Sequence, residues 1–365
     1  MTTLDRMFLV SYFRSYFIVL TSLLSLYVVI DLFTNIDSFV ERGGGFANVV
    51  NHVVGYYTYR VSQIFDLMAE AITLLSAMFA VSWMQKNNEL LPQLSAGIPT
   101  RRVLRPVLIG CAVTLSLGPL NQELIVPRIA DRLVVGRDDP EGAKATVMMG
   151  AYDVSGVHVE GGAGFRKDKK IVKCSVTFPD APPSGMVHVT AEEAFFIPAN
   201  GDKHSGGWLL LGAEPKTFDT PLPDTLEMID PGKYFLHTPE MTFDAVNRGA
   251  TWFLFASTPK LKELLSRPEP RRQSKVAVMF HMRITRPIAG AILVLLGLAV
   301  ILQNPNRHVI LSAGMCLVFC GWFYGCILGC KFLGENDFVS PPLAAWLPVL
   351  IFGPITLVTF DSIHT

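Results

Sequence analysis

Two carboxylates lie inside a long apolar run, a costly place for ionisable side chains. Asp66 and Glu70 are four residues apart in the run 58–84, so on a helix they share one face. Ionisable residues within a membrane segment usually face a bundle interior or a water-filled cavity. The pair is therefore a candidate for the polar wall of a substrate cavity. The alternative is a structural ion pair with Arg60 near the outer end of the same run.

No motif indicates catalysis, a metal site or a bound nucleotide. The chain lacks the G-x-x-x-x-G-K-[ST] phosphate loop, G-x-S-x-G and H-E-x-x-H. Its eight histidines are scattered, and its six cysteines have neither disulfide nor zinc spacing. Cys316/Cys320 and Cys326/Cys330 lie in an apolar run, where cysteine behaves as a small apolar residue. We predict no catalytic residue, no metal and no cofactor in this chain.

Arginines near the ends of the apolar runs are candidates for binding lipid phosphate. Their planar donor groups match phosphate oxygens. The candidates on the predicted outer side are Arg42, Arg60, Arg283 and Arg286. The alternative is that they anchor the chain to bulk lipid at the interface.

Two further patterns concern helices rather than chemistry. Gly321, Gly325 and Gly329 form a G-x-x-x-G-x-x-x-G ridge, which lets another helix approach closely. The ridge predicts either a seam that opens and closes or static packing within the bundle. Between two apolar runs, Glu89 would lie in the first turn of a short helix near 87–97, and Gly97 can end it.

The composition indicates a membrane protein. Half of the 365 residues are hydrophobic and 17% are charged, whereas about a quarter are charged in soluble proteins. The net charge is zero, so nothing indicates a nucleic-acid partner. A span needs about 20 apolar residues. Six runs qualify, at roughly 15–36, 58–84, 103–120, 284–302, 309–330 and 343–360. The first could be a signal peptide, but it is long and lacks a cleavage site.

The region between the third and fourth runs has a different pattern. Short alternating segments such as 171–178 and 186–190 are separated by Gly, Pro and Asp, which predicts a β-sandwich or jelly roll. Its inner faces can pack shut or open as a groove for acyl chains. We expect transmembrane helices in 1–120, a jelly-roll-like domain in 121–274 and transmembrane helices in 275–365.

The short-loop basic residues predict the orientation. One side holds Arg6, Arg14, Lys86, Arg101, Arg102, Arg105 and Arg307, and the other holds Arg42, Arg60 and Lys331. Because the cytoplasmic side carries the excess, both termini and the segment 87–97 are expected in the cytoplasm. The β domain is then expected on the outer side.

Six short motifs around the β insertion resemble the LptF/LptG-type permeases, also called the YjgP/YjgQ family. They are Leu4-Asp-Arg6, Glu89-Leu90 with Gly97-Ile98, Arg105-Pro106, Pro127-Arg128, His281-Met-Arg283 with Pro287, and Pro341-Pro-Leu-Ala-Ala-Trp-Leu-Pro348. These permeases are membrane subunits of the ABC transporter that extracts lipopolysaccharide from the inner membrane. The run 58–84 departs from the family pattern, which has prolines and apolar residues there.

The resemblance implies a six-span α-helical membrane protein of the bacterial inner membrane with an inserted, periplasmic, all-β jelly roll. It implies that the coupling residues Glu89, Leu90, Leu94, Gly97 and Ile98 contact an LptB-like ATPase dimer, which binds the ATP. A second LptF/LptG-like subunit would complete the lipid cavity, with the first and fifth spans at a lateral gate. The β domain would continue into a bridge of LptC-like and LptA-like proteins.

An external energy source fits the physics of lipid extraction. Removing acyl chains from a bilayer costs about 0.8 kcal/mol per methylene, and the chain has no ATP-binding motif of its own. The alternatives are an exporter subunit for another lipid or a lipoprotein, and a non-transporting scaffold that displays the β domain. The sequence does not distinguish an LptF-like from an LptG-like copy.

Overall fold

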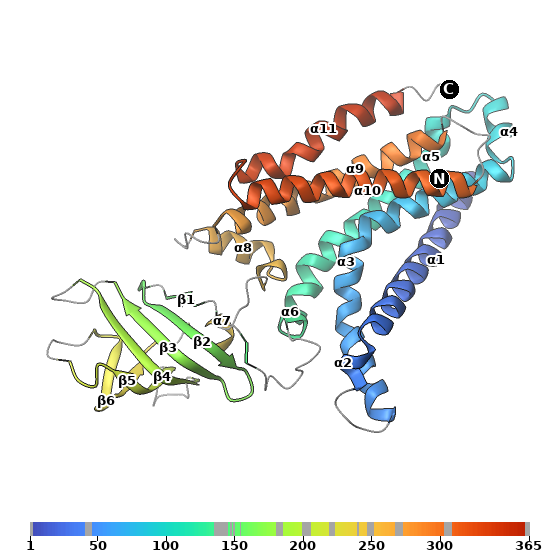
Figure 1. The fold of residues 1–365 in the computed structure, drawn as a ribbon. Helices are drawn as coiled ribbons and strands as arrows, with labels where there is room; N and C mark the ends of the chain where they lie inside the picture. Colours follow the sequence, from blue (N-terminus) through green and yellow to red (C-terminus); the bar gives the residue numbers. More distant parts are fainter. Residues whose placement is uncertain are drawn as a thin grey trace. The chain divides into compact units, whose positions relative to one another are not determined.

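The computed structural model falls into two compact units (Figure 1). A helical unit comprises Met1–Ala130 and Phe255–Thr365, and a β unit comprises Asp131–Leu254. The structure describes residues 3–40, 46–134, 145–146, 148, 150–153, 155–179, 185–198, 206–218, 223–238, 241–246, 252–266, 273–302 and 309–361. Parts 121–130 and 255–266 of the predicted β region therefore belong to the helical unit.

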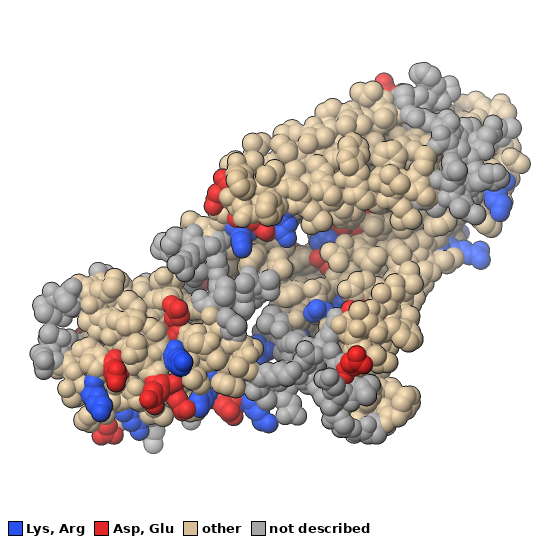
Figure 2. All heavy atoms as spheres, in the orientation of Figure 1, with Lys and Arg blue, Asp and Glu red and all other residues tan. Residues whose placement is uncertain are grey.

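Six helices of the described residues are long and apolar enough to span a membrane, which confirms the prediction of six spans. They are α1 (Thr3–Thr34), α3 (Phe46–Lys86), α5 (Thr100–Leu120) with its continuation, α9 (Gln273–Leu302), α10 (Val309–Glu335) and α11 (Pro341–Asp361). The face shown in Figure 2 is free of charged side chains along most of the helical unit, whereas charges are scattered over the β unit. The chain is thus a multi-pass membrane protein.

The helix α3 is longer than the apolar run that predicted it. At 1.5 Å per residue its 41 residues extend about 60 Å, twice the hydrocarbon thickness. Its first part packs beside the short helix α2 (Ile36–Val40), whose Phe39 ring is buried against Tyr56 and Tyr57. The Tyr57 hydroxyl donates to Asp31 of α1 at 2.7 Å. The apolar run therefore predicts only part of α3, and contacts with α1 and α2 stabilise the additional turns at its beginning.

The third span also continues past its predicted end at Leu120. A π-helical segment, η1 (Asn121–Ile125), joins α5 to α6 (Val126–Val134) without a break. Pro106 and Pro119 lie inside α5 rather than at its ends. Membrane helices tolerate proline where neighbouring groups compensate for the lost hydrogen bond.

Glycines at helix crossings set the packing of the bundle. A Cβ on Gly110 would lie 2.5 Å from the Tyr12 ring, and a Cβ on Gly297 would overlap Leu74. Tyr12 and Leu74 are fully buried. Helices therefore approach closely at both of these glycines.

The β unit contains one antiparallel sheet of seven strands (Figure 1), in the order β1-β2-β3-β4-β5-β7-β6. The strands are β1 (Ala151–Tyr152), β2 (His158–Phe165), β3 (Lys170–Phe178), β4 (Val187–Ile197), β5 (Gly207–Glu214), β6 (Leu226–Asp230) and β7 (Lys233–Leu236). Except for the pair β5 and β7, strands that are neighbours in the sheet are also neighbours in the sequence. The predicted class, a helical membrane protein with an inserted β domain, is confirmed.

Two details differ from the alternating pattern. The stretch 152–159 forms two strands, because Asp153 and Gly156 make a turn between them, with Asp153 N–H donating to Val157 O at 2.8 Å. In β3, burial does not strictly alternate, since Ile171 and Cys174 are both buried. Lys173 between them has a φ of +55°, outside the extended region. The irregular backbone at Lys173 therefore shifts the alternation by one residue, so that Ile171 and Cys174 both face the core.

Large side chains fill the inner face of the sheet among the described residues. Trp208 and Tyr234 are fully buried, and Trp208 Nε1 donates to Met241 O at 2.8 Å. Phe243 of α7 (Phe243–Val246) packs beside them. An acyl chain would have to displace these side chains. Burial also raises the pKa of the Cys174 thiol to about 12, so the thiol stays protonated at neutral pH.

Candidate functional site

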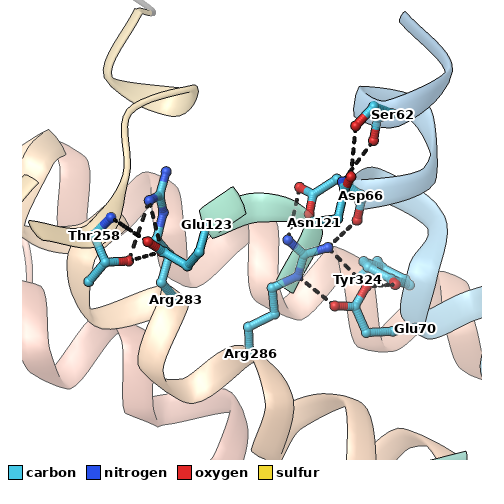
Figure 3. A network of polar contacts seen from close by, with 9 residues as sticks. All are labelled: Ser62, Asp66, Glu70, Asn121, Glu123, Thr258, Arg283, Arg286 and Tyr324. Carbon is cyan, nitrogen blue, oxygen red and sulfur yellow. Dashed lines mark hydrogen bonds and ion pairs between the residues drawn. The ribbon is translucent and has the colours of Figure 1, made fainter. Parts of the chain in front are cut away.

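The most highly charged contact within the helical unit is centred on Arg286 of α9 (Figure 3). Its guanidinium meets Glu70 through Nε at 2.5 Å and Nη2 at 3.3 Å, and meets Asp66 Oδ2 through Nη1 at 3.0 Å. The backbone oxygen of Asp66 accepts another bond from Nη2. Asp66 and Glu70 share one face of α3, as predicted, and Arg286 lies against that face.

Measured along α3, the Arg286 cluster lies less than one hydrocarbon thickness from Trp83. The Lys86 ammonium lies 5.7 Å from the Trp83 ring centre, a combination typical of the membrane interface. Glu70 and Asp66 are about 20 and 25 Å further along α3 than Trp83, in a core about 30 Å thick. Their side chains are 11% and 16% exposed. With Trp83 at one interface, the cluster would lie in the half of the membrane remote from the segment 87–97.

Two neighbouring residues shape the cluster. Gly290, one turn beyond Arg286 on α9, leaves room for Glu70, because a Cβ there would lie 3.1 Å from Glu70 Cγ. The Tyr324 hydroxyl of α10 donates to Glu70 Oε2 at 3.3 Å. The cluster therefore connects the three helices α3, α9 and α10 (Figure 3).

A second cluster lies beside it in Figure 3. Glu123 of η1 accepts bonds from Thr258, the first residue of α8 (Thr258–Leu265), and lies 3.5 Å from Arg283 Nη1. The Arg283 side chain is only 7% exposed. Asn121 of η1 exchanges two hydrogen bonds with Ser62 of α3, at 2.7 and 3.0 Å.

These contacts show which arginine pairs with Asp66 and Glu70, while their role in a substrate cavity stays a prediction. Asp66 and Glu70 form ion pairs with Arg286, whereas Arg60 lies over the Tyr56 ring at 5.6 Å. The structural partner is thus a distant arginine rather than the one on the same helix. The arrangement can hold helices together within the membrane.

The contacts also bear on the predicted phosphate ligands. Arg283 and Arg286 both contact carboxylates, so a lipid phosphate would have to compete with those contacts. Phosphate binding by these two residues and by Arg60 stays a prediction. Arg42 lies outside the described residues.

The predicted coupling segment forms a short helix, α4 (Leu90–Ser95), between α3 and α5. Leu90 is buried in a cluster with Phe8, Met84 and Val103, and Ile98 packs against that cluster. Glu89 precedes the helix and is half-exposed, and its carbonyl accepts a bond from the Gln93 side chain at 2.9 Å.

The other predicted coupling residues lie toward the outside of α4. The Leu94 side chain is exposed. Gly97 is exposed as well and has a φ of +75°, which favours glycine at the end of a helix. One side of α4 is therefore held by the bundle while its other side is open.

The glycine ridge of α10 faces outward. Gly321, Gly325 and Gly329 are exposed, and a Cβ on any of them would meet nothing within 4 Å. The described part of this chain therefore offers no close packing partner for the ridge, and both predicted roles stay predictions. The exposed residues Leu317, Trp322 and Leu328 also lie on α10.

Sequence reasoning missed several residues of the two clusters. Asn121 and Glu123 follow directly on an apolar run and were read as the end of a span. Tyr324 and Gly290 carry no signal by themselves, since tyrosine and glycine are common in spans. The available hint was the polar triplet 121–123 adjoining a span. Among the described residues, no group of His, Cys, Asp and Glu is arranged to hold a metal ion.

The comparisons with known proteins assign the helical unit and part of the β unit. The family model described as "Lipopolysaccharide export system permease LptF/LptG" matches residues 6–135 and 215–361. The unmatched interval contains the strands β1 to β5. No curated protein matches the chain.

Proposed function

Since the chain belongs to the LptF/LptG family of lipopolysaccharide export permeases, we propose that it is a membrane subunit of an ABC transporter that extracts lipopolysaccharide from the bacterial inner membrane. In this proposal a separate LptB-like ATPase dimer binds and hydrolyses ATP, and this chain carries no cofactor. Family members are transport subunits rather than enzymes, so the chain contributes the path and the coupling.

The observation that carries the proposal is the geometry of α4. Leu90 anchors the helix in a buried cluster that includes Met84 of α3 and Val103 of α5. Glu89 and Leu94 remain accessible on the other side. A short helix that is packed against two spans moves together with them. A conformational change in an ATPase bound to α4 would therefore be transmitted to α3 and α5. The segment thus suits an energy-coupling contact.

The proposed orientation places α4 and both termini in the cytoplasm and the β unit in the periplasm. The excess of basic residues near α4 supports it. A bridge of LptC-like and LptA-like proteins would then continue from the β unit. An edge strand can accept a strand from a neighbouring domain, and β6, at one edge of the sheet and inside the family match, is largely exposed.

The second permease subunit is proposed to approach the glycine ridge of α10. The ridge is exposed, and glycine spacing of this kind lets helices come close in a membrane. Such a contact can form a seam that opens and closes, which is one of the two predicted roles of the ridge. The fifth span would then line the gate together with the first span of the partner.

Replacing Gly325 with isoleucine should weaken association with the second subunit by about 1–3 kcal/mol, the usual cost of overpacking. The side chain has room within this chain, so folding should be unaffected. Gly55→Ile is the matched control, because Gly55 is also exposed with open space around it. Co-purification of the second subunit measures the effect. Equal recovery with both variants would rule out the ridge as the contact.

The function is tested by reconstitution. The chain should co-purify with a soluble ATPase and a second permease, and mass spectrometry should find lipopolysaccharide in the complex. In proteoliposomes, ATP should drive release of lipopolysaccharide to a periplasmic acceptor. A different bound lipid would indicate another export substrate. If no ATPase co-purifies and ATP drives no release, the alternative function is supported, in which the chain is a non-transporting scaffold that displays the β unit.

A further inference from the structure

Two segments connect the β unit to the helical unit: η1 with α6 leads into it, and the chain from Phe255 to α8 leads out of it. We propose that Glu123 is a positioning residue that holds these two segments together and to helices α3 and α9, so that movements of these helices reach both segments at once. The inference rests on the proposed transport function, in which motion in the membrane has to reach the β unit. It concerns contacts within the helical unit, made by Glu123, Thr258 and Arg283. We call these three residues the Glu123 latch.

The outgoing connection to the β unit is a continuous helical segment that is hydrogen-bonded to α3. Helix α5, η1 and α6 follow one another without a break, and the β unit begins at Asp131 within α6. Asn121 is buried and pairs with Ser62 of α3 through two hydrogen bonds. Short π-helical segments inside α-helices are rare and are frequently found at functional sites. Here the segment contains Asn121 and Glu123, which contact different partners.

The returning connection is capped by Glu123. The helical unit resumes at Phe255, and α8 begins at Thr258. The N–H groups at a helix start need acceptors from outside the helix, and Ser257, at the N-cap, makes no side-chain cap. The Thr258 N–H instead donates to Glu123 at 3.0 and 3.2 Å, and its hydroxyl donates as well. A carboxylate at a helix N-terminus is also favoured by the helix dipole.

Arg283 joins the latch to α9. Its Nη1 lies 3.5 Å from Glu123 Oε1 and 3.4 Å from Thr258 Oγ1. Burial of the arginine reduces competition from water and strengthens the attraction to the carboxylate. Glu123 therefore contacts the start of α8 and a buried cation of α9, while the adjacent Asn121 holds the same segment to α3 (Figure 3).

The latch implies that the two connections cannot separate while Glu123 is charged and bound. A hydrogen bond to a charged group typically shifts an equilibrium roughly ten- to hundredfold. Without the bonds between Glu123 and Thr258, α8 can separate from η1. A displacement of α3 would then reach only the segment that leads into the β unit, and a displacement of α9 only the segment that leads out of it. ATP hydrolysis would continue, since α4 is a separate contact, but less lipid would be transferred per ATP.

The test combines hydrogen exchange with transport in the reconstituted complex. In Glu123→Gln, amide exchange in the peptide that begins at Thr258 should accelerate roughly ten- to hundredfold. The ATPase rate should stay unchanged while lipopolysaccharide transferred per ATP falls several-fold. Thr258→Ser, which keeps both donors, should behave as wild type. Glu263→Gln is the matched control, because Glu263 lies on α8 and pairs with Lys260 at 2.7 Å, outside the latch.

Each outcome distinguishes the latch from the transport function. Fast exchange in Glu123→Gln with unchanged transfer per ATP would show that the latch does not transmit motion. Unchanged exchange would show that Glu123 does not hold α8, which also overturns the inference. If the wild-type complex transfers no lipopolysaccharide, the proposed function fails, and the exchange result still decides whether the latch exists.

Discussion

Arg286→Leu is expected to destabilise the helical unit by about 3–5 kcal/mol, the cost of leaving a buried carboxylate without its partner. Among the described residues, Glu70 would lose two donors and keep only the Tyr324 hydroxyl, while Asp66 would lose its ion pair. Both carboxylates are largely buried, so water replaces the lost contacts poorly. Thermal unfolding in detergent should show a lower midpoint and a lower yield of folded protein.

A combined variant separates charge pairing from packing. Asp66→Leu, Glu70→Leu and Arg286→Leu together remove the three charged side chains of the Arg286 cluster. Replacement of a whole buried ion-pair group by apolar residues is often neutral or stabilising. The triple variant should therefore unfold at a higher temperature than Arg286→Leu alone. An Arg286→Leu protein as stable as wild type would contradict an ion pair at this position.

Glu89→Lys is expected to abolish coupling to the ATPase without preventing membrane insertion. The residue is half-exposed at the start of α4, and none of the hydrogen bonds described for it involve its carboxylate. Reversal of its charge should therefore disturb a bound partner more than the fold. At a close interface charge pair the loss is about 2–5 kcal/mol, or roughly thirtyfold or more in affinity. Co-purification of the ATPase and ATP-dependent lipid release measure it.

The control for Glu89→Lys adds a cation without removing the carboxylate. Asn87 is exposed two residues earlier, so Asn87→Lys places a similar charge beside α4. This variant should keep most of the ATPase binding. Complementary reversal of a basic residue on the ATPase should restore Glu89→Lys. Unimpaired release by Glu89→Lys would exclude the residue from the coupling contact.

Residue patterns do not reveal which small-residue surfaces of the helices are packed against another helix and which remain exposed. The glycine ridge of α10 and the glycines Gly110, Gly290 and Gly297 are equally small, yet the ridge is exposed and the others lie at close helix contacts. The spacing of small residues shows that a close approach is possible. Which helix fills the space depends on the arrangement of the whole bundle.

The same limit applies to the charged residues. The four-residue spacing of Asp66 and Glu70 correctly indicated a shared helix face, because helical geometry is local. Their partner Arg286 is more than 200 residues away in sequence, and Arg60 was the nearer choice along the chain. Glu123 was missed for a related reason. A polar residue after an apolar run usually ends a span, but here tertiary partners in α8 and α9 let the helix continue.

Membrane character, the six spans, the inserted β region and the family could be derived from the residues, because hydropathy and short motifs are properties of local segments. The position of α4 could be derived as well, since its flanking apolar runs and terminal glycine are local signals. In contrast, the pairing of Arg286 of α9 with α3, the capping of α8 by Glu123 and the exposure of the α10 ridge follow only from the folded arrangement. Those outcomes depend on contacts between distant segments, whose free energies arise only when the helices pack together.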